Sequence, residues 1–339
     1  MAEVAAAARV CRATVSLALR DNPQIPEPTR RRIRQAAKKL GYTPNPLVSA
    51  LMATRRRGRA RFQATLGFLT GHGTRDGWRR ASGAYAAFFD GARTRARSLG
   101  YNLVDFWLRE PNISGDRLKG ILRARGIDGL LLAPLPIENT VLPAFDWSGF
   151  SVIAAGYSVR EPEFHRISHD YFHGMTMALT HCREKGYRRI GLFLDSRVSK
   201  VLSNLWHAAY LAEQRTTPGV ELIEPLLATS WDDPAFGPWL REQRPDALIC
   251  LDPWLLENIG RLPKRLPVVC LNADEAPRPM PGISRDFGIV GEAAAERLVS
   301  LLHHNERGVP LRPQTILVEG VWINDRLLKD KRKNALTLA

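Results

Sequence analysis

Features that define several common protein classes are scarce or missing in this sequence. Its 339 residues include only four cysteines, which are widely spaced and form no C-x-x-C motif: Cys11, Cys182, Cys250 and Cys270. Neither a zinc site nor a disulfide framework is therefore indicated. No apolar run approaches the ~20 residues of a membrane span, and no signal-peptide core is recognisable near the N-terminus. These absences predict a cytoplasmic protein without a membrane partner.

Motifs of catalysis are also missing, since the sequence contains no G-x-S-x-G, H-E-x-x-H or P-loop. The segment from Gly71 to Gly77 mimics a dinucleotide fingerprint, but its third glycine comes one residue late and no helix is expected to open there. A polar loop is the better prediction. His165, His169 and His173 are spaced by four, as metal ligands on a helix are, yet only Asp170 lies near to complete a site. We expect no enzyme activity, no cofactor and no metal.

Acidic residues are few relative to basic ones, and the excess is unevenly placed. The chain has 34 Asp and Glu against 49 Lys and Arg, for a net charge of +15. Residues 1–63 alone hold 14 Lys and Arg against three acidic residues, a net +11. A small block that basic predicts a polyanionic partner. The remaining chain, with 45% hydrophobic residues overall, is long enough for one or two further domains.

Helical periodicity in the basic block points to a helix-turn-helix. Residues 1–8 form an alanine-rich helix, residues 9–11 are too short for anything but a turn, and residues 12–19 place apolar groups on one stripe. Val10 and Val15 occupy the two positions of a hydrophobic staple around Cys11. A third helix is predicted over 29–40, with Gly41 as its stop and a face rich in arginine and lysine. Such an arrangement places its second helix in the DNA major groove.

These motifs resemble the DNA-binding headpiece of lac repressor family regulators. The segments VAAAARVCRATVSLAL and TRRRIRQAAKKLGYTPNP reproduce the family's "TVS-x-AL" and "LGY-x-PN" patterns over residues 3 to about 52. The resemblance implies a double-stranded, pseudo-palindromic operator as partner. It also implies a hinge helix after Pro46, whose leucine Leu51 enters the minor groove; a linker helix packed on the next domain is the alternative. The DNA-contacting positions implied are Arg12, Ala13, Thr14, Ser16, Leu17, Arg20, Asn45, Val48 and Leu51.

The chain from residue 64 onward alternates strands and helices, which predicts parallel, doubly wound sheets with helices on both faces. Strands are expected at 65–70, 101–108, 129–133, 150–155, 189–194, 247–251, 268–271 and 316–321. Helices are expected at 85–99, 114–125, 174–185 and 290–302. Two such runs, one to Ala155 and one after Asp170, predict two similar lobes. The segments GYNL, IDGLLLAP, GYRRIG, DALIC and GIVGEAAAERLVSLL resemble the family's periplasmic-binding-protein-like core.

The same resemblance implies an effector site between the lobes, at the strand ends. Carried over one position at a time, the effector-binding residues are Tyr85, Asp170, Trp206, Asp252 and Asn272. Asp170 could instead simply cap a helix. The family's arginine in "R-x-x-G-F" has no counterpart here, because its position falls on Asn204 or Trp206. Trp206 and Trp254 are candidates for stacking on a sugar, or ordinary core aromatics.

The sequence thus predicts three parts: a helix-turn-helix headpiece (1–45), a hinge helix with a basic linker (46–63), and a two-lobed ligand-binding and dimerisation core (64–339). We expect a homodimeric transcriptional regulator, a repressor, that responds to a small carbohydrate effector. The alternatives are a solute-binding protein, which the missing signal peptide disfavours, and a sugar-modifying α/β enzyme, which lacks a catalytic constellation. The basic headpiece is unexplained by either. Helix 1 has no Ser/Thr cap, so the start is expected to lie upstream.

Overall fold

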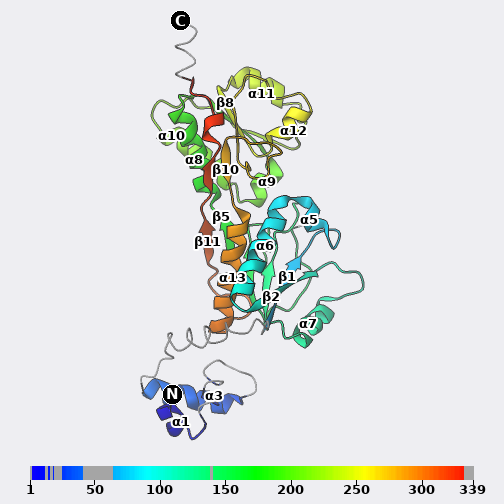
Figure 1. The fold of residues 1–339 in the computed structure, drawn as a ribbon, viewed down its shortest axis with the longest axis vertical. Coiled ribbons are helices and arrows are strands. Elements are labelled where there is room, and N and C mark those ends of the chain that lie inside the picture. Colours follow the sequence, from blue (N-terminus) through cyan, green and yellow to red (C-terminus); the bar gives the residue numbers. More distant parts are fainter. Residues whose placement is uncertain are drawn as a thin grey trace.

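The structure is a computed structural model that describes residues 2–11, 14–15, 18, 25–40, 64–137 and 140–331 (Figure 1). The predicted hinge helix and basic linker, residues 46–63, lie outside the described residues, as does the C-terminal end of the chain. Two helices of the headpiece are bounded: α1 spans Ala2–Ala7 and α3 spans Glu27–Lys39. The predicted third helix therefore begins two residues earlier than expected, because Pro28 is favoured in a first helical turn.

A small apolar core holds the described part of the headpiece together. It consists of Val4, Ala5, Ala8, Val15, Ala18, Ile33 and Ala37, with Val10 packed against it. Val10 and Val15 thus share one cluster, as the predicted staple requires. On α3, Arg31, Arg32, Arg34, Lys38 and Lys39 are all exposed, because the helix buries its Ile33 and Ala37 stripe. The basic face predicted from sequence is present.

The core contains two six-stranded sheets, one in each of two lobes (Figure 1). In lobe 1 the order is β11-β5-β4-β3-β1-β2, and every pairing is parallel. Its strands are β1 Ala64–Thr70, β2 Tyr101–Trp107, β3 Gly129–Leu132, β4 Ser151–Ala155, β5 His165–His169 and β11 Thr315–Val318. Its helices are α5 Gly77–Ala81, α6 Gly83–Ser98, α7 Gly115–Ala124 and α13 Phe287–His304.

In lobe 2 the order is β12-β10-β9-β8-β6-β7, and only β12 runs antiparallel to its neighbour. The strands are β6 Ile190–Asp195, β7 Leu226–Ala228, β8 Ala247–Cys250, β9 Val268–Cys270, β10 Gly282–Ser284 and β12 Val321–Ile323. The helices are α8 Tyr171–Glu184, α9 Ser196–Val201, α10 Leu205–Thr216, α11 Phe236–Gln243, α12 Pro253–Asn258 and the 3-10 turn η2 Asp325–Leu327.

Alternate residues of the central strands face opposite sides of each sheet and bury both faces. In lobe 1, Phe68 and Leu131 pack beneath α6 and α13, whereas Leu69 and Leu130 pack with α7. In lobe 2 the two sides are covered in the same way, by α8 and α10 on one face and by α11 and α12 on the other. The continuous apolar strands therefore form doubly wound layers, as the sequence predicts.

The chain crosses between the lobes three times: from β5 to α8, from β10 to α13, and from β11 to β12. The prediction of a single strand over 316–321 was therefore wrong, because that segment divides between the two sheets around Gly320. A Cβ at Gly320 would lie 2.6 Å from Cε1 of His169 and 2.7 Å from the Ser284 oxygen. The three crossing segments are therefore closely packed against one another. The sequence predicted one lobe from the run that ends at Ala155 and the other from the run after Asp170. In the structure, later segments of the chain return to lobe 1, so each lobe is built from separate parts of the sequence.

Helix α13 returns to lobe 1 and is fixed there by backbone contact with α6. A Cβ at Gly91 would lie 2.0 Å from the Gly288 oxygen, and one at Gly291 would lie 2.0 Å from the Phe88 oxygen. No side chain fits between helices this close. These contacts hold α13, and with it the crossing after β10, against lobe 1.

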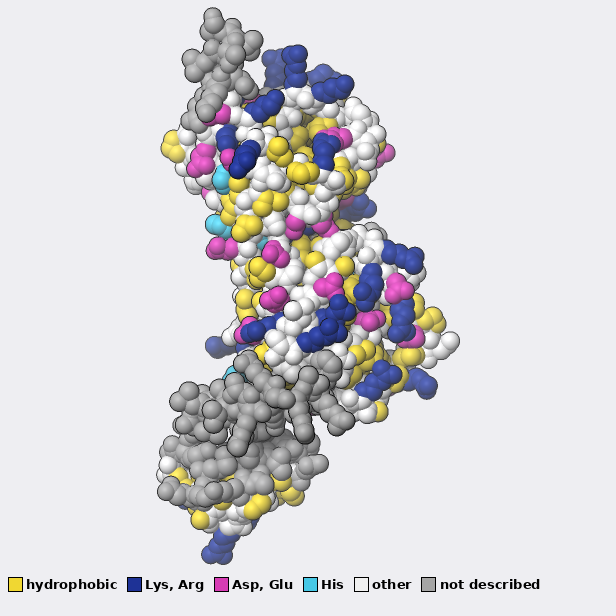
Figure 2. All heavy atoms as spheres, in the orientation of Figure 1, with side chains coloured by type: hydrophobic (Ala, Val, Ile, Leu, Met, Phe, Trp, Pro, Cys, Tyr) yellow, Lys and Arg dark blue, Asp and Glu magenta, His cyan; other side chains and the backbone are white. Residues whose placement is uncertain are grey.

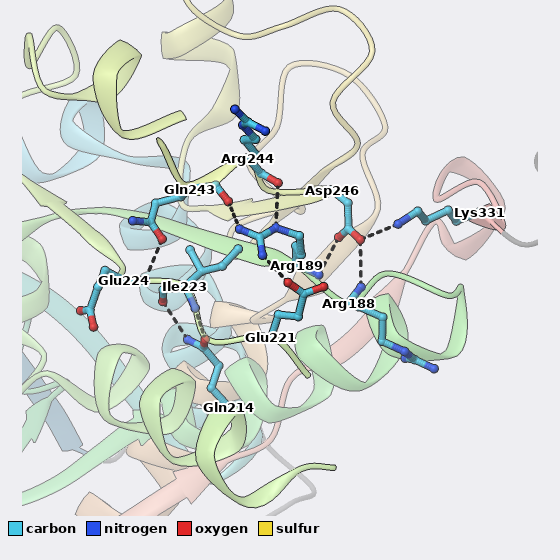
Figure 3. A network of polar contacts seen from close by, with 10 residues as sticks. All are labelled: Arg188, Arg189, Gln214, Glu221, Ile223, Glu224, Gln243, Arg244, Asp246 and Lys331. Carbon is cyan, nitrogen blue, oxygen red and sulfur yellow. Dashed lines mark hydrogen bonds and ion pairs between the residues drawn. The ribbon is translucent and has the colours of Figure 1, made fainter. Parts of the chain in front are cut away.

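A polar network secures the outer end of lobe 2 (Figure 3). Asp246 accepts hydrogen bonds from the backbone N–H groups of Arg188 and Arg189, both at 3.0 Å, and from Nζ of Lys331 at 2.6 Å. Gln214 accepts from the N–H of Ile223 at 2.7 Å and donates to its carbonyl at 3.2 Å. These bonds fix the start of β6 and the segment leading to β7, so this end of the lobe is a structural anchor.

Candidate functional site

A cavity of about 570 Å³ lies between the two lobes, where the carboxyl ends of their strands face each other. Its volume is within the range of small-molecule sites. On the face drawn in Figure 2, acidic side chains gather near the waist where the lobes meet. The N-terminus of α6 and the loops after β4 and β5 form the lobe 1 wall, while α9, α10, α12 and the segment after β9 form the lobe 2 wall.

Four of the five effector-binding residues predicted from sequence line this cavity: Tyr85, Trp206, Asp252 and Asn272. The fifth, Asp170, does not. It is the N-cap of α8, where its Oδ1 accepts a hydrogen bond from the N–H of His173 at 2.9 Å. An Asp at this position satisfies an otherwise unpaired helix N–H, so its sequence position alone could not distinguish a cap from a ligand contact.

Aromatic rings form much of the apolar wall. Trp206 is 1% exposed and packs edge-on against Tyr171, with ring centroids 4.9 Å apart. Tyr85 packs edge-on against His72 at 5.4 Å. Trp231 and Trp254 are half-buried and complete the lobe 2 wall. Trp206 is therefore both a core residue and a cavity residue, so the two alternatives left open by the sequence are not exclusive.

A chain of polar contacts crosses the cavity from one lobe to the other. Arg285, on the crossing after β10, donates from Nη2 to Oδ1 of Asn272 and lies 3.5 Å from Oε2 of Glu275. Nδ2 of Asn272 donates to Oε2 of Glu275 at 2.7 Å. Ser82, at the N-cap of α6 in lobe 1, donates from Oγ to Oε1 of Glu275 at 2.5 Å. Each lobe thus contributes donors to one carboxylate.

Asp252 is the most perturbed acidic side chain in the cavity. Burial raises its pKa to about 6, although Arg285 and a hydrogen bond with Asn272 act in the opposite direction. At neutral pH the group is a partly desolvated carboxylate, which accepts hydrogen bonds strongly. Such a group suits recognition of ligand hydroxyls.

Two further titratable side chains occupy the cavity with different roles. Asp195 is buried and accepts from Nη2 of Arg197 at 2.6 Å, so these two opposite charges are paired at the lobe 2 rim. His169 is buried among the three crossings, and burial together with the positive charge of Arg285 lowers its pKa to about 3. The ring is therefore neutral at physiological pH.

Sequence reasoning missed Ser82, Glu275 and Arg285. Ser82 was accessible in principle, since a serine immediately before a helical pattern is an N-cap signal. Arg285 follows β10, which is only three residues long and carries no periodic pattern. Glu275 lies in a turn after β9. Its role depends on a residue nearly two hundred positions away, and no local pattern reports such a contact.

The other candidate motifs are accounted for by local structure. The segment Gly71–Gly77 forms a loop, as expected, but the short helix α5 does open at Gly77, contrary to prediction. The carbonyls of Gly71 and His72 accept from Arg109 and Trp107 at 2.7 Å, so they serve the fold. His165 lies in β5, and its Nε2 is 3.0 Å from Oε1 of Glu306. Within the described ranges, no cluster of three metal-ligating side chains occurs.

Of the predicted DNA-contacting residues, Thr14 alone lies within the described part of the chain. Thr14 lies in a helical segment, with Oγ1 3.1 Å from Sγ of Cys11. The other predicted DNA-contacting residues lie outside the described part of the chain: Arg12, Ala13, Ser16, Leu17, Arg20, Asn45, Val48 and Leu51. Among the described residues, no helix has the length and apolarity needed to cross a membrane.

Comparison with known proteins gives one family match and one curated relative. Residues 1–45 match the family described as "Bacterial regulatory proteins, lacI family". Over 190 residues the chain is 29% identical to the HTH-type transcriptional regulator CelR of Thermobifida fusca, a match that covers 55% of this chain and 53% of CelR. The match thus spans about half the length of this relative.

Several solved structures share the fold of this chain. A transcriptional regulator CelR–cellobiose complex is 21% identical with a TM-score of 0.52, covering 95% of this chain and 97% of that one. A lac repressor dimer bound to operator and the anti-inducer ONPF is 18% identical with a TM-score of 0.51, covering 95% and 96%. A LacI family regulator, CCPA from Weissella paramesenteroides with bound glucose, is 13% identical with a TM-score of 0.53, covering 79% and 99%. At these identities the likeness concerns the fold.

The fold and the cavity define a class: a helix-turn-helix headpiece followed by a periplasmic-binding-protein-like core with a ligand-sized cavity between its lobes. The headpiece match and the CelR relative narrow that class. Residues 1–45 match the lacI family of bacterial regulatory proteins, which confirms the resemblance seen in the sequence of the headpiece.

Proposed function

We propose that this protein is a sequence-specific DNA-binding transcriptional regulator, a repressor, whose operator affinity is controlled by a small carbohydrate bound between the core lobes. The observation that carries the proposal is the junction of a lacI-type headpiece with a cavity of about 570 Å³. The CelR structure holds cellobiose and the CCPA structure holds glucose, which supports a sugar-type effector.

The chemistry of the cavity supports an uncharged, hydroxyl-rich ligand. Trp206, Trp231, Trp254 and Tyr85 offer apolar ring surface, and Asp252 offers a hydrogen-bond acceptor. Aromatic surface combined with acceptors and donors suits the mixed faces of a sugar ring. The cations Arg285 and Arg197 are each paired with an acidic group, so no net positive charge is available for an anion.

The proposal includes a homodimer on a pseudo-palindromic operator in the cytoplasm. A single headpiece makes few base contacts, and two-fold protein symmetry matches a two-fold operator. The lac repressor structure of the same fold is a dimer on operator DNA, which supports this assembly. A solute-binding role is less well supported, because the basic headpiece would then have no purpose.

Two experiments test the proposal. Selection of binding sequences from a random duplex library should return a pseudo-palindrome, and affinity should fall steeply with added salt. A thermal-shift screen against neutral mono- and disaccharides, cellobiose and glucose among them, should show a concentration-dependent rise in melting temperature for at least one sugar. DNA binding without sequence preference and with a flat salt dependence would contradict the proposal of a sequence-specific regulator. If no sugar raised the melting temperature, the proposal of a carbohydrate effector would be wrong.

A further inference from the structure

The carboxylate of Glu275 reaches from lobe 2 into lobe 1. Glu275 lies in the segment after β9, and its Oε1 accepts from Oγ of Ser82 and from the N–H of Ala84, both at 2.5 Å. These two donors form the N-terminus of α6. The other oxygen, Oε2, accepts from Asn272 and faces Arg285. Three hydrogen-bond donors, two from lobe 1 and one from lobe 2, and the Arg285 guanidinium therefore converge on one side chain.

The surroundings of Glu275 favour its charged form. Burial raises the pKa of this carboxyl, but hydrogen bonds from Ser82, Asn272 and Ala84, together with the charge of Arg285, outweigh burial and lower the pKa overall. The side chain is 19% exposed, and that of Arg285 is 10% exposed, so the contact is shielded from water. A carboxylate at the N-terminus of the 16-residue helix α6 is further stabilised by the helix dipole.

The backbone of lobe 1 is shaped to admit this carboxylate. Gly83 is the first residue of α6, and a Cβ there would lie 3.2 Å from Oε1 of Glu275. That distance is tighter than an ordinary van der Waals contact. A side chain at position 83 would therefore push against the oxygen, while glycine leaves the approach open.

We propose that Ser82, Ala84, Asn272 and Arg285 form a carboxylate-binding site across the cleft, and that Glu275 fills it as a latch that holds the lobes closed without an effector. The regulatory meaning of the latch rests on the proposed function. If the effector binds the closed lobes, the latch raises its apparent affinity by keeping the competent state populated. Because the chain itself supplies the anion, the cavity left beside the latch is for an uncharged ligand.

The test is carried out on the full-length protein without any effector, so its outcome does not depend on the proposed function. Hydrogen exchange of the Ala84 amide and the small-angle scattering radius are compared for wild type, Glu275→Ala and Ser82→Ala. The matched control is Glu257→Ala, which removes a carboxylate paired with Arg278 within lobe 2 and touches no lobe 1 residue. We expect about tenfold faster exchange of Ala84 in Glu275→Ala, a larger scattering radius, a smaller effect in Ser82→Ala, and none in the control.

Chemical rescue separates a lost carboxylate site from a damaged fold. Sodium acetate, whose carboxylate has the size of the group removed, should restore slow exchange and the smaller radius in Glu275→Ala but leave wild type unchanged. Sodium chloride at equal ionic strength should not. The proposal is overturned if Glu275→Ala remains folded and keeps the wild-type exchange rate and scattering radius. It is also overturned if Ser82→Ala, which keeps the carboxylate, has the same exchange rate as the control and acetate fails to restore slow exchange in Glu275→Ala.

Discussion

Arg285 and Trp206 face each other at the base of the inter-lobe cavity, with Cζ of the arginine 6.0 Å from the centre of the indole ring. The family resemblance puts an arginine in the helix at Asn204 or Trp206. The structure brings Trp206 to the cavity, while Asn204 is the N-cap of α10 and bonds Ser199 at 3.1 Å. A guanidinium is nevertheless present, because Arg285 supplies it from the crossing after β10.

The first prediction concerns Arg285. Arg285→Met should weaken binding of the sugar found in the screen by about ten- to a hundredfold, because a buried charged donor is lost and Asn272 and Glu275 lose their partner. Arg285→Lys should retain only part of the sugar affinity, because an ammonium group lacks the planar, bidentate donor geometry of a guanidinium. Calorimetry measures both. Arg278→Met, which removes a half-exposed arginine paired with Glu257, is the control and should bind normally.

A second prediction follows from the raised pKa of Asp252. An acid whose pKa is about 6 in the folded state and lower in the unfolded state makes the protein more stable as pH falls through 6. From pH 7 to pH 5 this one group should add about 1 kcal/mol to the free energy of unfolding. Urea denaturation of wild type and Asp252→Asn at both pH values isolates the contribution of Asp252 to the free energy of unfolding. A difference between the two proteins that does not change with pH would contradict the prediction.

Base reading and phosphate contact should separate in the headpiece. Arg12→Ala should relax the operator sequence preference by about 1–3 kcal/mol, because an arginine at this position of the recognition helix can bond guanine bidentately. Arg32→Ala, on the exposed basic face of α3, should weaken all sequences alike and reduce the salt slope by about 1. Titrations on selected and scrambled duplexes at several salt concentrations distinguish them. An unchanged sequence preference in Arg12→Ala would assign Arg12 to the phosphates or to the fold.

The contact between α6 and α13 gives a stability prediction. Gly91→Ala should destabilise lobe 1 by about 1–3 kcal/mol, because the added Cβ would overlap the Gly288 carbonyl. Gly120→Ala is the matched control in helix α7, where a Cβ meets nothing within 4 Å. It should stabilise the protein by about 0.5–1 kcal/mol through helix propensity. Equal melting midpoints for the two variants would show that the helices separate without cost.

The sequence predicted the layered α/β core well because buried parallel strands and amphipathic helices carry strong local patterns. Tyr85, Asp252 and Asn272, which the family resemblance assigned to the effector site, line the cavity, in keeping with the tendency of ligand sites in such sheets to lie at strand ends. The sequence-based prediction missed β7 and β10, which have three residues each, although it included β9, which is equally short, at the apolar segment 268–271. It also merged β11 and β12, because a crossing between lobes at Gly320 depends on packing that a local pattern does not encode.

The Glu275 contact illustrates the same limit in the site. An acid in a turn is ordinarily a solvated surface charge, and only the folded chain shows that Ser82 and Ala84 lie within 2.5 Å of it. Asp170 illustrates the converse, because a family position can be retained for capping. Whether a polar side chain is buried, and which group it contacts, depends on the tertiary structure. Residue type and spacing, by contrast, can be taken from the sequence alone.

The most direct test of the central claim is the affinity of the sugar found in the screen, measured by calorimetry with and without operator DNA. If the cavity regulates DNA binding, thermodynamic linkage requires the operator to change sugar affinity by the factor by which the sugar changes operator affinity, about fivefold or more. Leu51→Ala, in the predicted hinge helix, should reduce that factor. Equal sugar affinities with and without operator in the wild type would contradict the account.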